Sequence, residues 1–447
     1  MGAAYRAARD GHRVTLVERA GHVGGAAASH SVAGVRVDLG SHRLHPTVEP
    51  RILAELRALL GDDLQRRPRN GRIRLGGRWI AFPLRPLDLA RRLPPAMAAG
   101  ALRDAALGPL RPGPRADTFE EVLRSALGPT LCERFYFPYA RKLWGLEPSE
   151  LAGEQARRRV AARSPGRLVA RALARGSAGK RFFLYPRRGY GQLWEALAGA
   201  AADAGAEVLL DAEARRLELG PEGARVTLAD GRALEARRVW STLPVTALAR
   251  MVERAPPAEA LAAADALEYR AMALVYLVVP RPRYSPFDAH YLPGGATPVT
   301  RVSEPRNYRD GDDPEGVTVL CAEIPCAADG DLFGAPAEEL GRVAVEGLVE
   351  AGLPRPEVAA VEAARLRHAY PVLRAGTGAR LAAIDGWAAE QPALLTLGRQ
   401  ALFVHDNAHH ALAMAWAAAD CLGRDGSFDD DAWARARGRF AGHVVED

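Results

Sequence analysis

The sequence predicts an α/β protein that holds part of a dinucleotide-binding fold, and three features of its first residues indicate this. Residues 3–9 have the composition of a short helix, which Gly11 can end. The run RVTLV at 13–17 is typical of a buried parallel strand. Glu18 follows that strand, where such folds place the acid that hydrogen-bonds a ribose hydroxyl.

The opening part of this motif does not precede the helix. A dinucleotide-binding fold begins with a strand and a Gly-x-Gly-x-x-Gly turn. That first strand is central in the sheet, so its loss would be large against the ~5–15 kcal/mol stability of a whole protein. We therefore expect the missing strand and turn to be encoded upstream of Met1.

Size and composition limit the possible classes of protein. The 447 residues suffice for two or three domains, and 48% hydrophobic with 26% charged residues is typical of a globular chain. The net charge of +6 comes from scattered arginines, which does not favour nucleic acid as a partner. No apolar run is long enough for an integral membrane segment, although the Arg-rich stretch 162–175 suits peripheral contact. The cysteines lack zinc or redox spacing and indicate reduced thiols in a cytoplasmic protein: Cys132, Cys321, Cys326 and Cys421.

Hydrophobic periodicity gives a coarse order of elements. From about residue 51 to 180 the pattern is mainly helical, with proline-rich breaks, and after residue 186 helices and strands alternate. The stretch 214–244 alternates short strands with turns, as in a β-meander. The other expected helices are 51–60, 118–128 and 336–351, and further strands are expected at 271–280, 316–324 and 361–368. The stretch 191–210 is expected to form a helix followed by a strand. The stretch 394–422 is expected to form a strand, a loop and a helix.

Two loops near the N-terminus carry candidate ligand-binding residues. Gly24 and Gly25 let the backbone approach a pyrophosphate or a flat ring without Cβ interference, with an ordinary flexible loop as the alternative. In VDLGSHRLHP (37–46), His42, Arg43 and His45 follow a strand and Gly40. Such side chains can hydrogen-bond a redox ring or balance its negative charge, with solvated loop residues as the alternative.

Two later segments are also candidates. FYFPYARKLWG (135–145) interleaves aromatic residues with Arg141 and Lys142, and either lines an elongated pocket or joins two helices. GRQALFVHDNAHHALAM (398–414) has a glycine turn before a helix, a form that places amides near an anion. His405 and His409 stand four residues apart, with Asp406 and His410 nearby, but this spacing alone is weak, and we predict no metal site.

Taken in order, these segments resemble the flavin-containing amine oxidase and protoporphyrinogen oxidase-like superfamily, and more narrowly its branch related to UDP-galactopyranose mutase. The resemblance covers nearly the whole chain. Its motifs here are AAYRAARDGH, VTLVER, the Gly-Gly loop, DLGSHRLHP, PYARKLWGL, YPRRGYGQLWEAL, AYPVLRAG and the final GR-x-x-LF loop. Val404, His405 and His409 depart from residues that relatives often carry in the last loop, which concerns the substrate class rather than the fold.

The resemblance implies an α/β fold with a Rossmann-like FAD-binding domain of the glutathione-reductase type and a mixed α+β substrate domain. FAD would be bound by parts at 1–75 (N-terminally truncated), 186–250 and 390–447. A mainly helical cap at 76–185 and a sheet at 251–389 would form the substrate domain. The cofactor-binding residues implied are Glu18, Gly24, Gly25, Gly40, His42, Val208, Leu209, Gly398, Asn407 and His410.

Three functions remain open from the sequence. The first is an FAD-dependent oxidoreductase acting on a small molecule, the second a non-redox flavin-dependent nucleotide-sugar mutase, and the third a flavin-free scaffold protein. A mutase would need an arginine pair that grips a diphosphate. Candidate catalytic residues are His42, Tyr139 and Lys142, and candidate substrate-binding residues are Arg43, Arg141, Arg187 and Arg188. Oligomeric state is not indicated.

Overall fold

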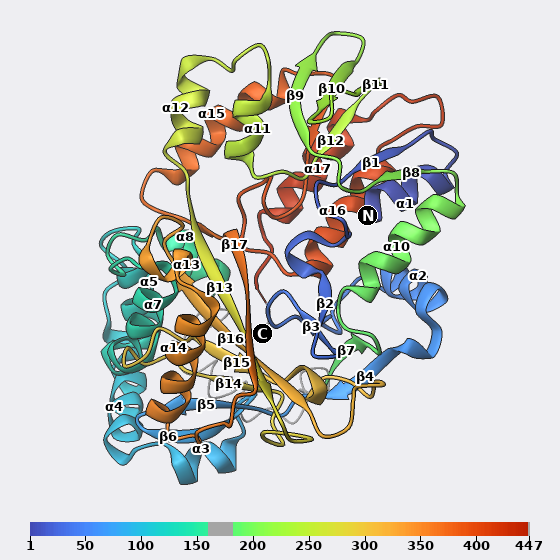
Figure 1. The fold of residues 1–447 in the computed structure, drawn as a ribbon. Coiled ribbons are helices and arrows are strands. Elements are labelled where there is room, and N and C mark those ends of the chain that lie inside the picture. The colour runs from blue at the N-terminus through green and yellow to red at the C-terminus, as the bar shows by residue number, and fades with distance from the viewer. Residues whose placement is uncertain (160–181, 446–447) are drawn as a thin grey trace.

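The computed structural model describes residues 1–159 and 182–445, and it divides into two halves (Figure 1). We name them after the sequence prediction as the nucleotide-binding half and the substrate half. The Arg-rich stretch 162–175 lies outside the described residues. In the nucleotide-binding half, two parallel strand pairs lie among helices: β1 (Thr15–Val17) with β8 (Glu207–Leu209), and β12 (Val239–Ser241) with β18 (Leu394–Thr396). The helices of this half are α1 (Gly2–Arg9), α2 (Pro50–Leu60), α10 (Gln192–Asp203), α16 (Ala408–Asp420) and α17 (Asp430–Phe440).

Small side chains let the helices of this half pack closely. Helix α1 contacts α10 and α16 through its alanines, and a Cβ on Gly2 would lie 2.6 Å from the Trp416 ring. Trp416 itself is fully buried, and its ring lies 6.2 Å from that of Tyr5. Large aromatic side chains on α16 and after β7 (Phe182–Pro186) thus fill the core that α1 covers.

A seven-stranded sheet forms the centre of the substrate half, in the order β17-β13-β16-β15-β14-β5-β6. On β13, Met272, Leu274 and Tyr276 face the β2–β3 hairpin, while residues such as Ala273 and Val275 face α14. Successive side chains of a strand point to opposite faces of the sheet, and here both faces are buried. The elements are β5 (Gly71–Leu75), β6 (Arg78–Phe82), β13 (Glu268–Val279), β14 (Ala289–Tyr291), β15 (Arg301–Ser303), β16 (Thr318–Cys326), β17 (Ala360–Val372), α13 (Asp331–Gly334) and α14 (Ala337–Glu350).

Helices between β6 and β7 cover one end of this sheet (Figure 1). Their core gathers Phe119, Leu123 and Trp144, and Thr118 caps α5 by accepting the amide of Glu121 at 3.2 Å. A single π-helical turn at Cys132–Tyr136 precedes α7, an irregularity that is frequent at functional sites. These helices are α3 (Pro86–Arg92), α4 (Pro95–Ala106), α5 (Phe119–Leu127), α6 (Pro129–Leu131), α7 (Phe137–Trp144) and α8 (Gly153–Arg159), with a 3-10 turn η3 (Gly108–Leu110).

The remaining elements flank the nucleotide-binding half. They are the β2–β3 hairpin (Ser29–Val32 and Val35–Asp38), the β4–β7 pair, whose first strand is Leu64–Pro68, and an antiparallel sheet of β9 (Ala214–Leu219), β10 (Ala224–Leu228) and β11 (Ala233–Ala236). Short 3-10 turns are η1 (Gly25–Ala27), η2 (Gly61–Asp63) and η6 (Pro305–Asn307), and three more helices are α11 (Val245–Met251), α12 (Ala258–Asp265) and α15 (Thr377–Ala389).

The structure confirms the α/β class and most expected elements, with two differences. The stretch expected to be mainly helical also contains β4, β5 and β6. In addition, β12 does not continue the β9–β11 meander but pairs with β18, more than 150 residues later. The four cysteines are free and buried, and no helix within the described ranges is both long and apolar enough to cross a membrane.

One buried carboxylate joins three parts of the chain. Asp38, at the end of β3, is 3% exposed and accepts hydrogen bonds from Ser29 Oγ at 2.6 Å, the Tyr190 amide at 2.9 Å and the Tyr185 hydroxyl. Its backbone carbonyl accepts the Tyr276 hydroxyl from β13 at 2.8 Å. The end of β3 is therefore fixed both to the β7–α10 connection and to the substrate sheet.

We expect Asp38→Asn to lower the free energy of unfolding by about 2 kcal/mol, because an uncharged amide places an N–H group against buried donors. Urea unfolding followed by circular dichroism measures this. Asp230→Asn, an exposed carboxylate in the β10–β11 turn, is the matched control and should leave the midpoint nearly unchanged. Equal midpoints for Asp38→Asn and the parent chain would contradict this role of Asp38.

Candidate functional site

The end of β1 lies where a dinucleotide-binding fold would hold a ribose. Glu18 donates its amide to the Leu209 carbonyl at 2.9 Å, and its side chain accepts the amide of Ala20 at 2.9 Å. Val208 is in register with Leu16 across the parallel β1–β8 pair. The structure thus brings together three of the predicted cofactor-binding residues, Glu18, Val208 and Leu209, at one edge of the strand pair.

The glycine pair that follows has the backbone conformation that glycine allows. Gly24 has a φ of 105°, and a Cβ there would lie 2.8 Å from the indole of Trp194. Trp194 also donates its indole N–H to the Ala27 carbonyl at 3.0 Å, which holds α10 against the loop. Gly25 has a φ of 52°, but a Cβ there would meet nothing within 4 Å. Gly24 therefore serves the packing of the loop, and Gly25 borders open space.

The predicted Gly40–His42 turn lies beside the substrate sheet. Gly40 has a φ of 106°, and a Cβ there would lie 3.6 Å from Glu323 Oε1. The Ser41 amide donates to the same Glu323 oxygen at 2.8 Å. His42 Nε2 lies 3.0 Å from the Ala26 carbonyl and its ring stacks on Tyr190 at 5.3 Å. His42 thus ties its turn to the Gly-Gly loop.

A buried polar cluster continues from this turn across the sheet, which we call the arginine–tyrosine cluster: Ser41, Arg43, Asp288, Tyr291, Arg301, Tyr308 and Glu323. Arg43 donates to the Tyr291 and Tyr308 hydroxyls at 3.0 and 2.8 Å and lies 3.3 Å from Asp288. Arg301 Nη2 donates to both carboxylate oxygens of Glu323, at 2.7 Å to Oε1 and 2.8 Å to Oε2. Each arginine therefore has its own carboxylate, and the cluster is close to neutral.

The loop before α16 contributes from the C-terminal side. Gly398 has a φ of 87°, and Asn407 forms a capping box with His410, whose Nδ1 accepts the Asn407 amide at 3.2 Å. The side chain of Asp406 is fully buried, and its Oδ1 has no hydrogen bond, although it lies 3.6 Å from His410 Nδ1. A buried carboxylate oxygen without a donor is costly, and a hydroxyl-bearing ligand would satisfy it.

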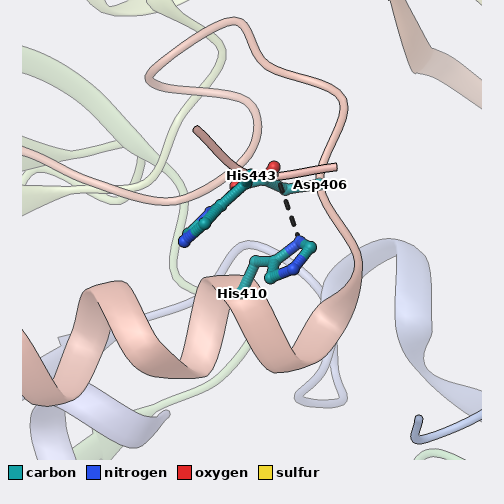
Figure 2. Close-up of side chains that lie close together, drawn as sticks. All are labelled: Asp406, His410 and His443. Carbon is teal, nitrogen blue, oxygen red and sulfur yellow. Dashed lines mark hydrogen bonds and ion pairs between the residues drawn. The ribbon is translucent and has the colours of Figure 1, made fainter. Parts of the chain in front are cut away.

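Asp406, His410 and His443 lie close enough to hold a metal ion, with ligand atoms within 4.8 Å of one another (Figure 2). The Nδ1 atoms of both histidines have partners within the chain: His443 Nδ1 bonds Asp406 Oδ2 at 2.9 Å, and His410 Nδ1 accepts a backbone amide and lies 3.6 Å from Asp406 Oδ1. These contacts hold the three side chains together. His405, weighed in the sequence as a ligand, bonds Gln155 of α8 at 2.9 Å instead.

The three candidate catalytic residues come from two elements. His42 follows β3, whereas Tyr139 and Lys142 lie on α7, where Tyr139 stacks on Phe135 at 6.2 Å. Lys142 Nζ donates to the backbone carbonyls of Leu292 and Val299 at 2.6 and 3.0 Å. Burial lowers the pKa of its ammonium to about 8, because the charged form loses water. Lys142 can therefore change protonation near neutral pH.

The structure separates the predicted substrate-binding arginines. Arg43 belongs to the arginine–tyrosine cluster, and Arg141 is an exposed partner of Glu147 at 2.8 Å. Arg187 and Arg188 line a cavity of about 380 Å³, with Arg187 bound to Asp63 at 2.9 Å. Acidic residues share that cavity, namely Glu195, Asp312 and Asp313.

Glu323, Arg301 and Asp38 are site residues that the sequence did not predict. A signal existed for Glu323, because it is the one charged residue in the nine-residue strand TVLCAEIPC, every residue of which is buried. A carboxylate in such a run needs a buried partner, which predicts a polar site. The partner, Arg301, lies in a three-residue strand that carries little pattern of its own.

The site combines three features: an acid at the end of a parallel strand, glycines at positive φ, and a buried polar cluster on an adjoining sheet. Together they indicate a class of protein in which one part binds a nucleotide cofactor and the other part binds a substrate. The chain belongs to the family of flavin-containing amine oxidoreductases, whose model matches residues 1–416. Members of this family bind flavin, and the expected cofactor is FAD.

Solved structures of similar fold include different activities. A reduced UDP-galactopyranose mutase is 20% identical, with a TM-score of 0.82 over 99% of this chain and 95% of its own. A protein from Exiguobacterium sp., provisionally named a protoporphyrinogen oxidase, is 18% identical, with a TM-score of 0.69 over 98% and 96%. Cyclohexylamine oxidase from Brevibacterium oxydans is 17% identical, with a TM-score of 0.65 over 98% and 96%. None of the curated protein sequences matches this chain.

The residues present fit a flavin nucleotide. Gly25 leaves room beside the backbone, Asp406 Oδ1 lacks a donor, and Gly40 and Gly398 hold conformations that favour glycine. We infer that Glu18 would hold the adenosine ribose of the cofactor and that the Gly-Gly loop would lie along its pyrophosphate. Asp406 would then accept a hydroxyl of the ribityl chain.

We expect Gly25→Ala to weaken FAD binding, because the new methyl group fills space that the cofactor would approach. Gly61→Ala is a matched control, since Gly61 has a φ of 53° and also has nothing within 4 Å of a Cβ. Both substitutions carry the same backbone cost of about 1–2 kcal/mol. Bound flavin per chain, measured after gel filtration, should fall only in Gly25→Ala; equal retention in both variants would contradict the assignment.

Lys142 should give a pH-dependent stability. Its pKa is about 8 in the folded chain and ~10.4 when unfolded, so the unfolded state binds more protons between these values. Unfolding free energy therefore rises with pH in that window, and the penalty for burying the charge is fully present below pH 8. Relative to Lys142→Met, the parent chain should gain roughly 2 kcal/mol between pH 7 and 10 in urea unfolding. A difference that does not change with pH would contradict the lowered pKa.

Proposed function

We propose that the protein is an FAD-dependent oxidoreductase that oxidises a small organic substrate at a C–N or C–C bond. The observation that carries this proposal is the arginine–tyrosine cluster, in which Arg43 pairs with Asp288 and Arg301 with Glu323. The cluster adjoins Gly40, and the family resemblance places Gly40 and His42 at the flavin ring. A polar but neutral site of this kind suits a small substrate of low charge.

Each residue of the cluster has a distinct task in this proposal. Glu323 fixes the Ser41 backbone through its amide and holds Arg301, so the turn beside the ring keeps one geometry. The Tyr291 and Tyr308 hydroxyls are held by Arg43 and can orient a polar group of the substrate. The chemistry that bound FAD would supply is the acceptance of two electrons from the substrate.

Lys142 is the residue whose protonation best suits a proton acceptor in this proposal. The free amine is present above about pH 8, within the range where a general base works best. The carbonyls of Leu292 and Val299 hold its nitrogen between α7 and the sheet. Its role is either to accept a substrate proton or to position the strands that carry Tyr291.

The alternative, a non-redox nucleotide-sugar mutase, receives support from the UDP-galactopyranose mutase fold. It requires a pair of arginines for a diphosphate. Arg43 and Arg301 are neutralised by their own carboxylates, while Arg141 and Arg187 are bound to Glu147 and Asp63. Arg188, the remaining candidate for a diphosphate, lines a cavity that Glu195, Asp312 and Asp313 also line. This distribution of charge supports the oxidoreductase.

The direct test is anaerobic mixing of the flavin-loaded protein with a panel of primary amines, including cyclohexylamine and putrescine. Loss of flavin absorbance on mixing with one of them supports the proposal. Conversion of UDP-galactopyranose by dithionite-reduced protein, with no reduction by any amine, would replace it with the mutase. A folded but colourless protein would favour the scaffold alternative.

We expect Glu323→Gln to slow substrate-dependent flavin reduction at least about tenfold, because the Ser41 turn and Arg301 lose their shared anion. Glu304→Gln is the matched control. Glu304 is equally buried and accepts the Tyr284 and Ser285 amides at 2.7 and 3.0 Å, outside the arginine–tyrosine cluster. Stopped-flow rates should fall in the first variant and not in the second; equal rates would contradict a role for Glu323.

A further inference from the structure

Exposed leucines gather on one segment of the helical cap. Among the described residues, eight large apolar side chains are exposed, and five of them lie between residues 84 and 110. They are Leu84, Leu87, Leu102, Leu107 and Leu110, and Leu87, Leu102 and Leu110 are 72%, 71% and 80% exposed. The segment comprises α3, α4 and η3, at the end of the cap farthest from α1 in Figure 1. We call it the leucine–arginine surface.

The inward sides of these helices are already packed. Leu89 and Leu93 contact the apolar cluster around Ile80, and Met97 on α4 is 3% exposed. Asp104 is buried and accepts the Thr130 amide at 2.7 Å. The exposed leucines are therefore not needed to attach α3 and α4 to the domain. Their contact with water is unfavourable and contributes nothing to the packing of the fold.

The charge around these leucines is positive. Arg85, Arg91, Arg92 and Arg103 are exposed on the same segment. Two acids of this segment pair with two of these arginines: Asp88, which also accepts the Ala81 amide at 2.7 Å, pairs with Arg92, and the buried Asp104 pairs with Arg103 at 3.2 Å. The four arginines outnumber these two acids, so the segment keeps a net positive charge. Two copies meeting through this segment would oppose like charges, whereas an anionic surface would complement them.

We propose that the leucine–arginine surface binds the headgroup region of an anionic lipid bilayer. The leucines would enter the boundary between headgroups and acyl chains, and the arginines would contact lipid phosphates while their stems cover apolar surface. Exposed leucines interspersed with arginines along helices match the composition of segments that lie in the interface of a bilayer. This inference does not depend on the reaction that the site catalyses.

Sedimentation of the full chain with vesicles tests the proposal. One set contains phosphatidylcholine alone, and the other contains about one third phosphatidylglycerol. We expect binding to the second set only, weakened when NaCl is raised from about 0.1 to 0.5 M. Leu87→Ser/Leu110→Ser should weaken binding roughly tenfold or more. Arg85→Gln/Arg91→Gln should weaken it on anionic vesicles as well.

The control variant is Leu243→Ser/Val349→Ser, which removes exposed apolar side chains outside the leucine–arginine surface and should bind as the parent does. Thermal melting of all variants should match the parent, because the altered side chains are exposed. Failure of the parent to sediment with either vesicle overturns the proposal. A dimer in analytical ultracentrifugation that Leu87→Ser/Leu110→Ser dissociates also overturns it, since a second copy would then cover the surface.

Discussion

The buried carboxylate of Asp38 is the constraint on which the two halves of the molecule depend. Three donors from β2, β7 and the start of α10 meet on its oxygens, and a tyrosine of β13 meets its carbonyl. Hydrogen bonds to a charged, buried group are strong and directional. The end of β3 therefore has one position relative to the sheet, and this position also fixes the Gly40 turn that follows β3.

This position explains how residues far apart in the chain form one site. Ser41 can meet Glu323 only because β3 is held against the sheet that contains β16. The loop before α16 reaches the cap through the bond from His405 to Gln155, and the His405 ring stacks on Tyr370 of β17. The C-terminal part, the cap and the sheet therefore meet at His405. A family of flavin-containing enzymes needs such a junction, where cofactor and substrate meet away from water.

The sequence predicted what depends on local pattern. The helix at 51–60, the helix–strand unit ending at 209 and the capped helix after Asn407 all have strong periodicity or cap residues. The β5–β6 hairpin was missed although Gly76 and Gly77 lie between its two strands, a hairpin signal that the surrounding helical pattern obscured.

The remaining features depend on contacts that a sequence does not display. The pairing of β12 with β18 and the bond from Ser41 to Glu323 join residues about 150 and 282 positions apart, respectively. The separation of Arg141 from Arg187 likewise follows from tertiary structure, because each is held by a carboxylate on a neighbouring turn or loop. Non-local pairings of this kind decide which charged residues share a site.

The absorption spectrum of the purified chain after gel filtration tests the central claim most directly. The account predicts flavin bands near ~375 and ~450 nm that stay with the protein, and FAD as the nucleotide released on denaturation. A protein that folds cooperatively yet takes up no added FAD and shows neither band, both as printed and with the strand and glycine-rich turn expected upstream of Met1 restored, would contradict it.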